Sequence, residues 1–256
     1  MLFDTHAHLL AEQFEADRAE VLERFKGEGV TLYLEAGTTA ADSAKAIEWA
    51  QAHEGVFAAA GIHPHEAGEA NAADIDALAG PLQKEKCVAL GEIGLDYHYD
   101  FSPRDVQKQV FEAQLCLAAA QKVPVVIHDR EAHGDMLAML SAFKGRVYGV
   151  MHCYSGSVED AKRLLDMGYY ISFSGSVTFK NAARLPEVAA YVPHDRILAE
   201  TDSPYMAPVP KRGQRNNPGN VRLVVEKLAA LRGIGFEQMA AQTRENGKRL
   251  FGIGDN

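Results

Sequence analysis

Residues 123–129 read VPVVIHD, a nearly continuous apolar run that ends in a histidine and an aspartate. Parallel strands that helices cover on both faces are built from such runs, whereas strands with one wet face alternate apolar and polar residues. Seven further stretches are rich in apolar and aromatic residues: LFDTHAHL (2–9), VTLYLEAG (30–37), VFAAAGIH (56–63), CVALGEIGL (87–95), VYGVMHCY (147–154), YYISFSG (169–175) and RILAETD (196–202). The sequence therefore predicts eight strands of a parallel sheet.

Helical patterns separate these stretches. Ser102-Pro103 offers a cap and a first helical residue, and Ser157 with Asp160 resembles a capping box. The patterns predict helices over Glu15–Lys26, Ala41–His53, Asp105–Gln121, residues 157–168 and Val221–Leu250, the last one outside the sheet. Sustained alternation of strand and helix favours an α/β fold of the (β/α)8 TIM-barrel type, in a single domain over residues 1–256. No GxGxxG follows the first strand, so a dinucleotide-binding sheet has no support.

The composition narrows the classes of function. With a formal net charge of −9 and a pI near 5.6, the chain lacks the basic surface of a generic nucleic-acid binder. Three cysteines, Cys87, Cys116 and Cys153, give no paired spacing, which argues against a disulfide framework and favours a reducing compartment. We find no signal-peptide pattern and no apolar run long enough to span a bilayer. We therefore expect a soluble, cytoplasmic protein with no membrane association and no obligate protein partner.

Histidines gather where the predicted strands end. Six of the ten histidines stand at these positions, joined there by two carboxylates: His6, His8, His63, His65, His128, His152, Glu92 and Asp202. Because a barrel of parallel strands carries its chemistry at the carboxyl ends of those strands, we expect these groups to converge. Imidazole nitrogens with carboxylate oxygens suit zinc, and also magnesium or manganese. The pattern predicts one or two divalent ions.

Single residues of this set also have simpler interpretations. His128 could be a buried histidine bonded to the backbone, and Asp202 could cap the turn that begins at Ser203-Pro204. Glu92 is harder to explain without a ligand, because a lone carboxylate at the end of a buried strand is costly unless it is paired or binds a metal. The metal hypothesis therefore depends on the whole set.

The motifs FDTHAHL, GIHPH, GEIGLDY, VIHDR, HCYSGS and LAETDSPYMAP, in this order, resemble the TatD family of metal-dependent deoxyribonucleases, which belongs to the amidohydrolase-like hydrolases. They run from residue 3 to residue 208, and RGQRNNP extends the match to residue 218. Two positions depart from the usual family pattern: Tyr154 stands where many members have Phe, and Asn217 where many have an acidic residue. The resemblance implies a metal-dependent hydrolase with a TIM-barrel fold.

The resemblance also implies roles for the residues. His6 and His8 would hold one metal ion, and Glu92 would bridge two ions. His128 and His152 would complete the second site, and Asp202 would be both a ligand and the acceptor of a proton. His63 and His65 would face the substrate. The catalytic groups would therefore be Glu92 and Asp202, and the cofactors two divalent ions, Mg, Mn or Zn.

Such a site predicts hydrolysis of phosphodiesters. Two neighbouring divalent ions can activate a water and hold the attacking and leaving oxygens, while Asp202 takes the proton of the water. Arg130 is the best candidate to neutralise charge on the phosphoryl oxygens. Lys211, Arg212 and Arg215 form a basic cluster that either follows a nucleic-acid backbone or is simply a solvated loop. The predicted substrate is nucleic acid: single-stranded DNA, with RNA as a second candidate, degraded by a 3′-to-5′ exonuclease.

Two other functions fit part of the pattern. The same ions could activate water against a carbonyl carbon, which would make the protein an amide, lactone or aminoacyl-ester hydrolase. Alternatively, the ligands could only brace the barrel of a non-catalytic binding module. The basic cluster separates the first alternative from a nuclease, and Asp202 separates the second, because a binding module does not need a proton acceptor.

Overall fold

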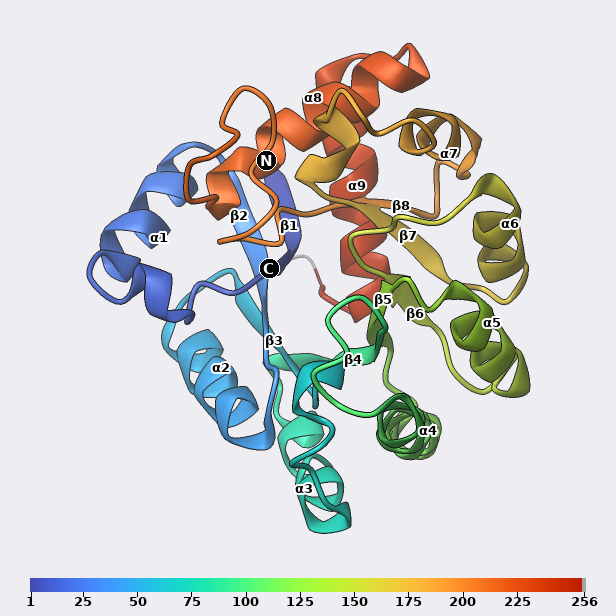
Figure 1. Ribbon diagram of the computed structural model, residues 1–256. Helices are drawn as coiled ribbons and strands as arrows, with labels where there is room; N and C mark the ends of the chain where they lie inside the picture. Colours follow the sequence, from blue (N-terminus) through green and yellow to red (C-terminus); the bar gives the residue numbers. More distant parts are fainter. Residues whose placement is uncertain (255–256) are drawn as a thin grey trace. The chain divides into compact units, whose positions relative to one another are not determined.

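In residues 1–254, which the computed structural model describes, eight strands form one sheet whose spatial order follows the chain, from β1 to β8 (Figure 1). The strands are β1 (Leu2–Ala7), β2 (Val30–Ala36), β3 (Val56–Ala60), β4 (Cys87–Asp96), β5 (Val125–Arg130), β6 (Gly149–Met151), β7 (Tyr170–Phe173) and β8 (Ile197–Ala199). The predicted (β/α)8 fold class is confirmed, and each of the eight apolar stretches contains a strand.

Helices alternate with the strands. The α-helices are α1 (Arg18–Gly27), α2 (Ala40–Ala52), α3 (Ala72–Ala77), α4 (Arg104–Gln121), α5 (His133–Ala142), α6 (Val158–Asp166), α7 (Leu185–Tyr191), α8 (Val221–Arg232) and α9 (Phe236–Phe251). Short 3-10 helices are η1 (Glu12–Phe14), η2 (Pro64–Glu66), η3 (Pro81–Gln83), η4 (Gly175–Thr178) and η5 (Pro218–Asn220). No helix of the described residues is both long enough and apolar enough to cross a membrane.

The described chain divides into two compact units. The first unit comprises residues 1–35, 152–162 and 170 onward, and the second comprises residues 36–151 and 163–169. The prediction of a single domain is not tested by this division and stays a prediction.

In the first unit, the segment after β8 pairs with β1. The His8 N–H donates to the Ser203 carbonyl at 2.7 Å, and the Asp202 N–H donates to the His6 carbonyl at 2.9 Å. Helices α8 and α9 lie beside β1 and β8, which they cover (Figure 1). Because these hydrogen bonds are between backbone groups, they place Asp202 next to the histidines of β1 whatever the side chains do.

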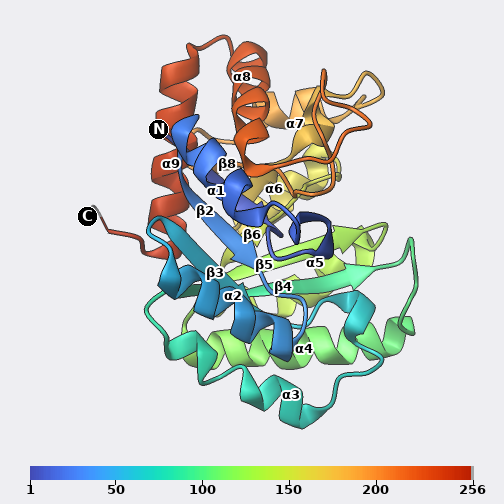
Figure 2. The same cartoon turned by 90° about the vertical axis from the view of Figure 1, so that its left-hand side faces the viewer.

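In the second unit, α4 packs along β4 (Figure 2) and fixes the segment that follows β3. The fully buried Gln114 side chain of α4 accepts a hydrogen bond from the Ile62 N–H at 2.8 Å and donates one to the Ile62 carbonyl at 3.0 Å. One amide thus satisfies both backbone groups of the residue before His63. The position of His63 therefore depends on α4.

Two local predictions differ from the structure, and one is confirmed. Val221–Leu250 is not one helix but two, because Gly233 takes a left-handed conformation with φ +65° that ends α8. Ser102 does not cap α4; its hydroxyl donates to the His65 carbonyl at 2.9 Å instead. The capping pair is confirmed, since the Asp160 N–H donates to Ser157 Oγ at 3.1 Å and Ser157 Oγ donates to the Asp160 carboxylate at 2.8 Å.

We predict that Gln114→Leu lowers the free energy of unfolding by about 2–4 kcal/mol, because it leaves the N–H and the carbonyl of Ile62 buried without their partner. The matched control is Glu112→Leu on the exposed side of the same helix, for which we expect a change within about 0.5 kcal/mol. Urea unfolding followed by circular dichroism measures both values. Equal effects of the two substitutions would contradict this account of how α4 holds the β3 segment.

Candidate active site

His6 in β1 and His8 just after it point ring nitrogens toward each other. His6 is fully buried at the carboxyl end of β1, and its Nε2 atom lies 3.1 Å from Nε2 of His8. Two nitrogens that bind one ion at about 2.1 Å must lie about 3.0–3.4 Å apart, for octahedral or tetrahedral geometry respectively. The observed separation therefore fits a pair of ligands to one ion.

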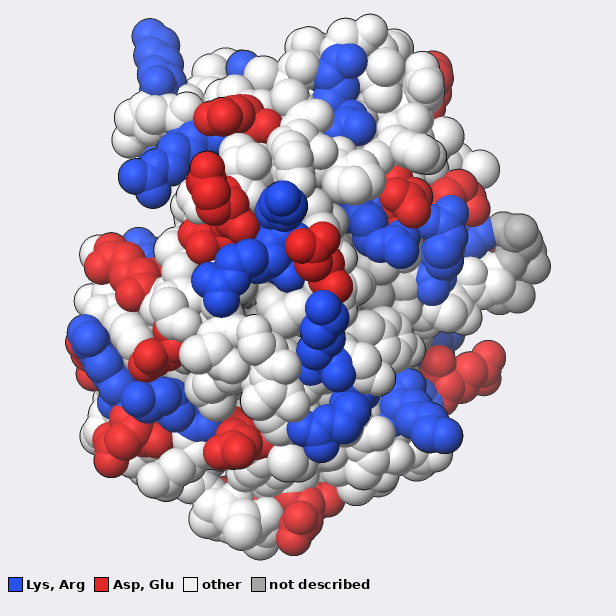
Figure 3. All heavy atoms as spheres, turned by 90° about the vertical axis from the view of Figure 1, so that its right-hand side faces the viewer, with Lys and Arg blue, Asp and Glu red and all other residues white. Residues whose placement is uncertain are grey.

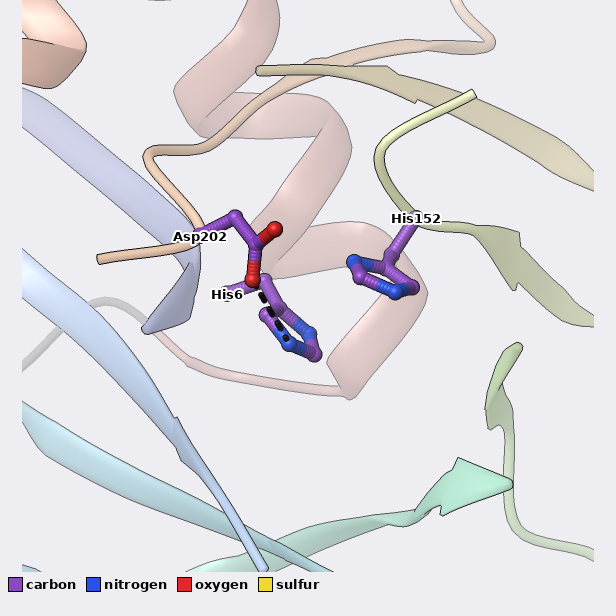
Figure 4. Close-up of side chains that lie close together, drawn as sticks. All are labelled: His6, His152 and Asp202. Atoms are coloured by element: carbon purple, nitrogen blue, oxygen red, sulfur yellow. Dashed lines mark ion pairs between the residues drawn. The ribbon is translucent and has the colours of Figure 1, made fainter. Parts of the chain in front are cut away.

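His152 and Asp202 complete this group in the first unit. The ring of His152, just after β6, stacks on the ring of His6 with centroids 4.0 Å apart. The carboxylate of Asp202, just after β8, points toward His6, and its Oδ1 atom lies 3.9 Å from His6 Nε2 and 3.8 Å from His8 Nε2 (Figure 4). We call His6, His8, His152 and Asp202 the first ligand group. Four of the predicted metal-binding residues thus lie together.

A buried glutamate holds the ring of His152. The Oε1 atom of Glu200 lies 3.2 Å from His152 Nδ1 and accepts a hydrogen bond from the Cys153 N–H at 2.7 Å. Burial acts to raise the pKa of Glu200. The hydrogen bond from His152 and the electrostatic attraction of His152 and His6 outweigh this effect, so the pKa lies below its usual value. A carboxylate at Nδ1 keeps the proton on that nitrogen and leaves Nε2 to bind a metal ion.

A second set of ligands lies in the second unit. His128 of β5 has its Nδ1 atom 2.9 Å from Oε1 of Glu92, which lies in the middle of β4. His63 Nε2 lies 3.4 Å from the same glutamate oxygen. We call Glu92, His128 and His63 the second ligand group. Predicted metal-binding and substrate-binding residues thus share one carboxylate.

Asp96, at the end of β4, holds the ring of His128 through one ring nitrogen, as Glu200 holds the ring of His152. Its fully buried carboxylate lies 3.1 Å from His128 Nε2 and 2.8 Å from His65 Nε2. Burial acts to raise the pKa of Asp96, but hydrogen bonds from His128, the Tyr99 backbone and His65 outweigh it and hold the pKa well below its usual value. When His128 Nε2 donates its proton to Asp96, Nδ1 keeps a lone pair on the side of Glu92.

His63 of the second ligand group carries no charge at neutral pH. Burial lowers the pKa of His63 to about 4, although Glu92 opposes the shift, so the ring is neutral at pH 7. The His65 N–H donates to His63 Nδ1 at 3.1 Å, which puts the single ring proton on Nε2. His63 therefore presents an N–H donor beside Glu92, which suits an oxygen of the substrate better than a metal ion.

Both ligand groups bring together donor atoms of the kind that hold divalent ions. His6, His152 and Asp202 each offer a ligand atom, and these atoms lie within 4.8 Å of one another; the same holds for His63, Glu92 and His128. The donors are nitrogens and oxygens only, which suits zinc, manganese or magnesium rather than a soft ion. Each group also contains a histidine oriented by a buried carboxylate, the usual support of a metal ligand.

The predicted substrate-binding cations occupy different environments. Arg130 is exposed at the end of β5, with its guanidinium 4.8 Å from the centre of the Tyr99 ring. Arg215 is bound by both carboxylate oxygens of Asp17, at 2.5 and 2.8 Å. Arg212 lies over the Phe179 ring at 4.0 Å, and Lys211 is exposed in the same loop. Lys211 and Arg130 thus reach solvent, whereas Arg215 makes a structural ion pair.

Asp96 and Glu200 are buried carboxylates beside candidate ligand histidines, and the sequence analysis missed both. Both stand in motifs that it used: Asp96 lies four residues after Glu92 in GEIGLD, and Glu200 two residues before Asp202 in LAETD. A metal-binding histidine usually donates its other ring N–H to a carboxylate. A search for acidic residues near the ligand motifs would therefore have identified Asp96 and Glu200.

The family follows from a comparison with known proteins. A family model described as TatD related DNase matches residues 3–252. The chain therefore belongs to the TatD related DNase family. This finding confirms the resemblance inferred from the ordered motifs.

Similar proteins extend over the whole length of this TatD family member. It is 44% identical to the metal-dependent hydrolase YabD of Bacillus subtilis (strain 168), over 99% of this chain and 100% of the relative. It is 36% identical to the 3′-5′ ssDNA/RNA exonuclease TatD of Pantoea ananatis (strain LMG 20103), over 98% of this chain and 100% of the relative. The crystal structure of YJJV, a TatD homolog from Escherichia coli K12, superposes with a TM-score of 0.93 at 30% identity and covers 99% of this chain and 98% of that one.

We predict that Glu200→Gln weakens the affinity for Mn²⁺ by about 10- to 100-fold, because the neutral amide no longer holds the proton on His152 Nδ1. Isothermal titration calorimetry measures the affinity. Glu187→Gln, at an exposed position of α7 in the same unit, serves as the control and should bind Mn²⁺ like the wild type. An unchanged affinity in Glu200→Gln would remove the support for this carboxylate's role.

The low pKa of Asp96 makes a prediction for stability against pH. Because its pKa is lower in the folded than in the unfolded chain, the carboxylate stabilises the fold above about pH 4 and loses this contribution as the pH falls below that value. Asp96→Asn should therefore be less stable than the wild type by about 1–3 kcal/mol at pH 6. The difference should shrink between pH 5 and pH 2.5 in urea unfolding. A difference that is independent of pH would contradict the assignment.

Proposed function

We propose that this TatD family protein is a divalent-metal-dependent 3′-to-5′ exonuclease that degrades single-stranded DNA and RNA. The observation that carries the proposal is the pair of ligand groups in which a buried carboxylate orients a histidine, His152 behind Glu200 and His128 behind Asp96. The substrate and the polarity are supported by the relative from Pantoea ananatis, whose name is 3′-5′ ssDNA/RNA exonuclease TatD. The predicted alternative, a carbonyl hydrolase, is not favoured by these relatives.

Each ligand group would hold one divalent ion. His6, His8, His152 and Asp202 would bind the first, and Glu92 and His128 would bind the second. His152, which the family resemblance assigns to the second ion, is placed with the first because its ring stacks on His6. Bound there, the ions would act as Lewis acids toward the phosphodiester and lower the pKa of water. Mg, Mn and Zn all fit the donor atoms.

Asp202 is the candidate proton acceptor. Its side chain is 15% exposed, whereas His6 is fully buried, so Asp202 is the member of the pair that solvent reaches. The backbone hydrogen bond to His6 fixes its place, and its left-handed φ of +56° turns the carboxylate toward the histidines of β1. A fixed, accessible carboxylate can take the proton of the attacking water in the step that breaks the P–O bond.

His63 and Arg130 would bind the phosphate. His63 Nε2–H would donate to a non-bridging oxygen, and its neutrality at pH 7 means that it gives no proton away. The exposed guanidinium of Arg130 would offset the negative charge of the next phosphate along the strand. Both residues come from segments that Asp96 braces through His65 and His128.

The charge of the surface favours local contacts with the nucleic acid. The net charge is −9, and on the face drawn in Figure 3 basic and acidic side chains are interspersed rather than gathered by sign. Affinity for a polyanion must therefore come from the bound ions and from a few cations such as Arg130, Lys211 and Arg212. Single strands suit such a site, because their backbone is flexible enough to bring one phosphate after another to the ions.

We predict that the wild type shortens a single-stranded DNA oligomer labelled at its 5′ end into a ladder that keeps the label, when Mg²⁺ or Mn²⁺ is present. Asp202→Asn should lower kcat by about 10²- to 10⁴-fold, because the proton acceptor is lost. Glu92→Ala should lose activity, and both variants should bind Mn²⁺ more weakly, because Glu92 and Asp202 are both proposed ligands.

Glu226→Gln, on an exposed turn of α8, is the control and should degrade the oligomer like the wild type. Circular dichroism of each variant excludes loss of the fold. Immediate release of the labelled mononucleotide would overturn the 3′-to-5′ polarity. Equal inactivity of the wild type and both variants toward DNA and RNA would overturn the nuclease proposal.

A further inference from the structure

Two aromatic side chains lie exposed next to the second ligand group, on the loop between β4 and α4. Phe101 is 67% exposed and Tyr99 is 47% exposed, and their rings stack with centroids 5.2 Å apart and an angle of 22° between planes. Single exposed apolar residues are common on protein surfaces, but a contiguous exposed apolar patch often marks a binding site. The exposed rings of this pair therefore suit a ligand with a flat apolar face.

The pair is in contact with the residues of the proposed site. The ring of His65 lies 4.8 Å from Phe101 and 5.4 Å from Tyr99, edge to face in both cases. His65 shares the Asp96 carboxylate with His128 of the second ligand group. His65 thus lies between the aromatic pair and the carboxylate that holds His128 of the second ligand group.

The loop that carries the pair is fixed at both ends. Asp96 Oδ1 accepts hydrogen bonds from the N–H groups of His98 and Tyr99, at 3.0 and 2.9 Å. The buried Gln107 side chain donates to the carbonyls of Asp96 and Ser102, at 3.0 and 2.8 Å. The stacking surface is therefore held in place before a ligand arrives, which reduces the entropy lost on binding.

The charges around the pair favour an anionic ligand. Arg130 places its guanidinium 4.8 Å from the centre of the Tyr99 ring. Of the neighbouring acids, Asp100 is paired with Arg104 at 2.6 Å, and the Glu131 carboxylate lies 2.8 Å from Nδ1 of His98. A ligand with a flat apolar face and a negative charge matches these features, and a nucleotide of a single strand is such a ligand.

We propose that Tyr99 and Phe101, with Arg130, form an aromatic platform on which one base of the single-stranded substrate stacks while its phosphate meets the guanidinium. This inference rests on the proposed function and adds a subsite to it. Stacking on a ring is available to every base, so the platform would hold the strand in register without selecting its sequence.

The experiment measures kcat/KM for a series of single-stranded DNA oligomers, each with one abasic residue among the last four positions at the 3′ end. At one position, the wild type should degrade the abasic oligomer about 5- to 100-fold less efficiently than the intact one, which is the range of one base–aromatic contact. Phe101→Ala and Tyr99→Ala should remove this difference, and Phe101→Trp should keep it. A 2-aminopurine at that position should be quenched on binding to the wild type and not to Phe101→Ala.

Tyr148→Ala is the matched control, because Tyr148 is 42% exposed in the same unit but stands before β6, at the opposite end of the strand from His152. It should discriminate between the oligomers like the wild type. Equal efficiency of the wild type on all abasic and intact oligomers would overturn the platform and leave the exonuclease proposal standing. Failure of the wild type to degrade any oligomer would overturn both.

Discussion

The hydrogen bond between a histidine and a buried carboxylate is the interaction on which the rest of this site depends. Asp96 holds Nε2 of His128, and Glu200 holds Nδ1 of His152. A buried carboxylate is costly unless its hydrogen bonds are satisfied. Both oxygens of Asp96 face histidines or backbone N–H groups, and Oε1 of Glu200 faces His152 and the Cys153 N–H. The same contacts that stabilise these charges therefore decide which ring nitrogen is left for an ion.

Asp96 contacts both the proposed metal ligand His128 and the loop that carries the proposed stacking surface. One of its oxygens faces His65 and His128, and the other accepts the backbone N–H groups that begin the loop of Tyr99 and Phe101. A single charge thus holds a proposed metal ligand and the proposed stacking surface in one rigid piece. The backbone plays the equivalent part in the first unit, where hydrogen bonds between β1 and the segment after β8 bring Asp202 to His6.

The sequence was sufficient for the fold and for the selection of candidate ligand residues, whose role stays a prediction, because both depend on local patterns. Continuous apolar runs mark the strands, and histidines at their ends mark the ligands. It could not reveal that Asp96 and Glu200 stand behind those ligands, since their partners are 32 and 48 residues away along the chain. Nor could it assign the proton of His63, which depends on a backbone N–H of η2, or show that Arg215 is engaged with Asp17. The break between α8 and α9 lies at Gly233, whose left-handed conformation ends α8 inside the predicted helix Val221–Leu250.

The central claim is that carboxylate-braced histidines in both ligand groups bind divalent ions. Anomalous X-ray diffraction from crystals grown with Mn²⁺ tests it most directly, because manganese is located independently of any assumed ligand. We predict one anomalous peak bound by His6, His8, His152 and Asp202, and another bound by Glu92 and His128 Nδ1, with His128 Nε2 still on Asp96. Manganese bound to His63 Nε2 in place of His128, or no peak at either ligand group, would contradict it.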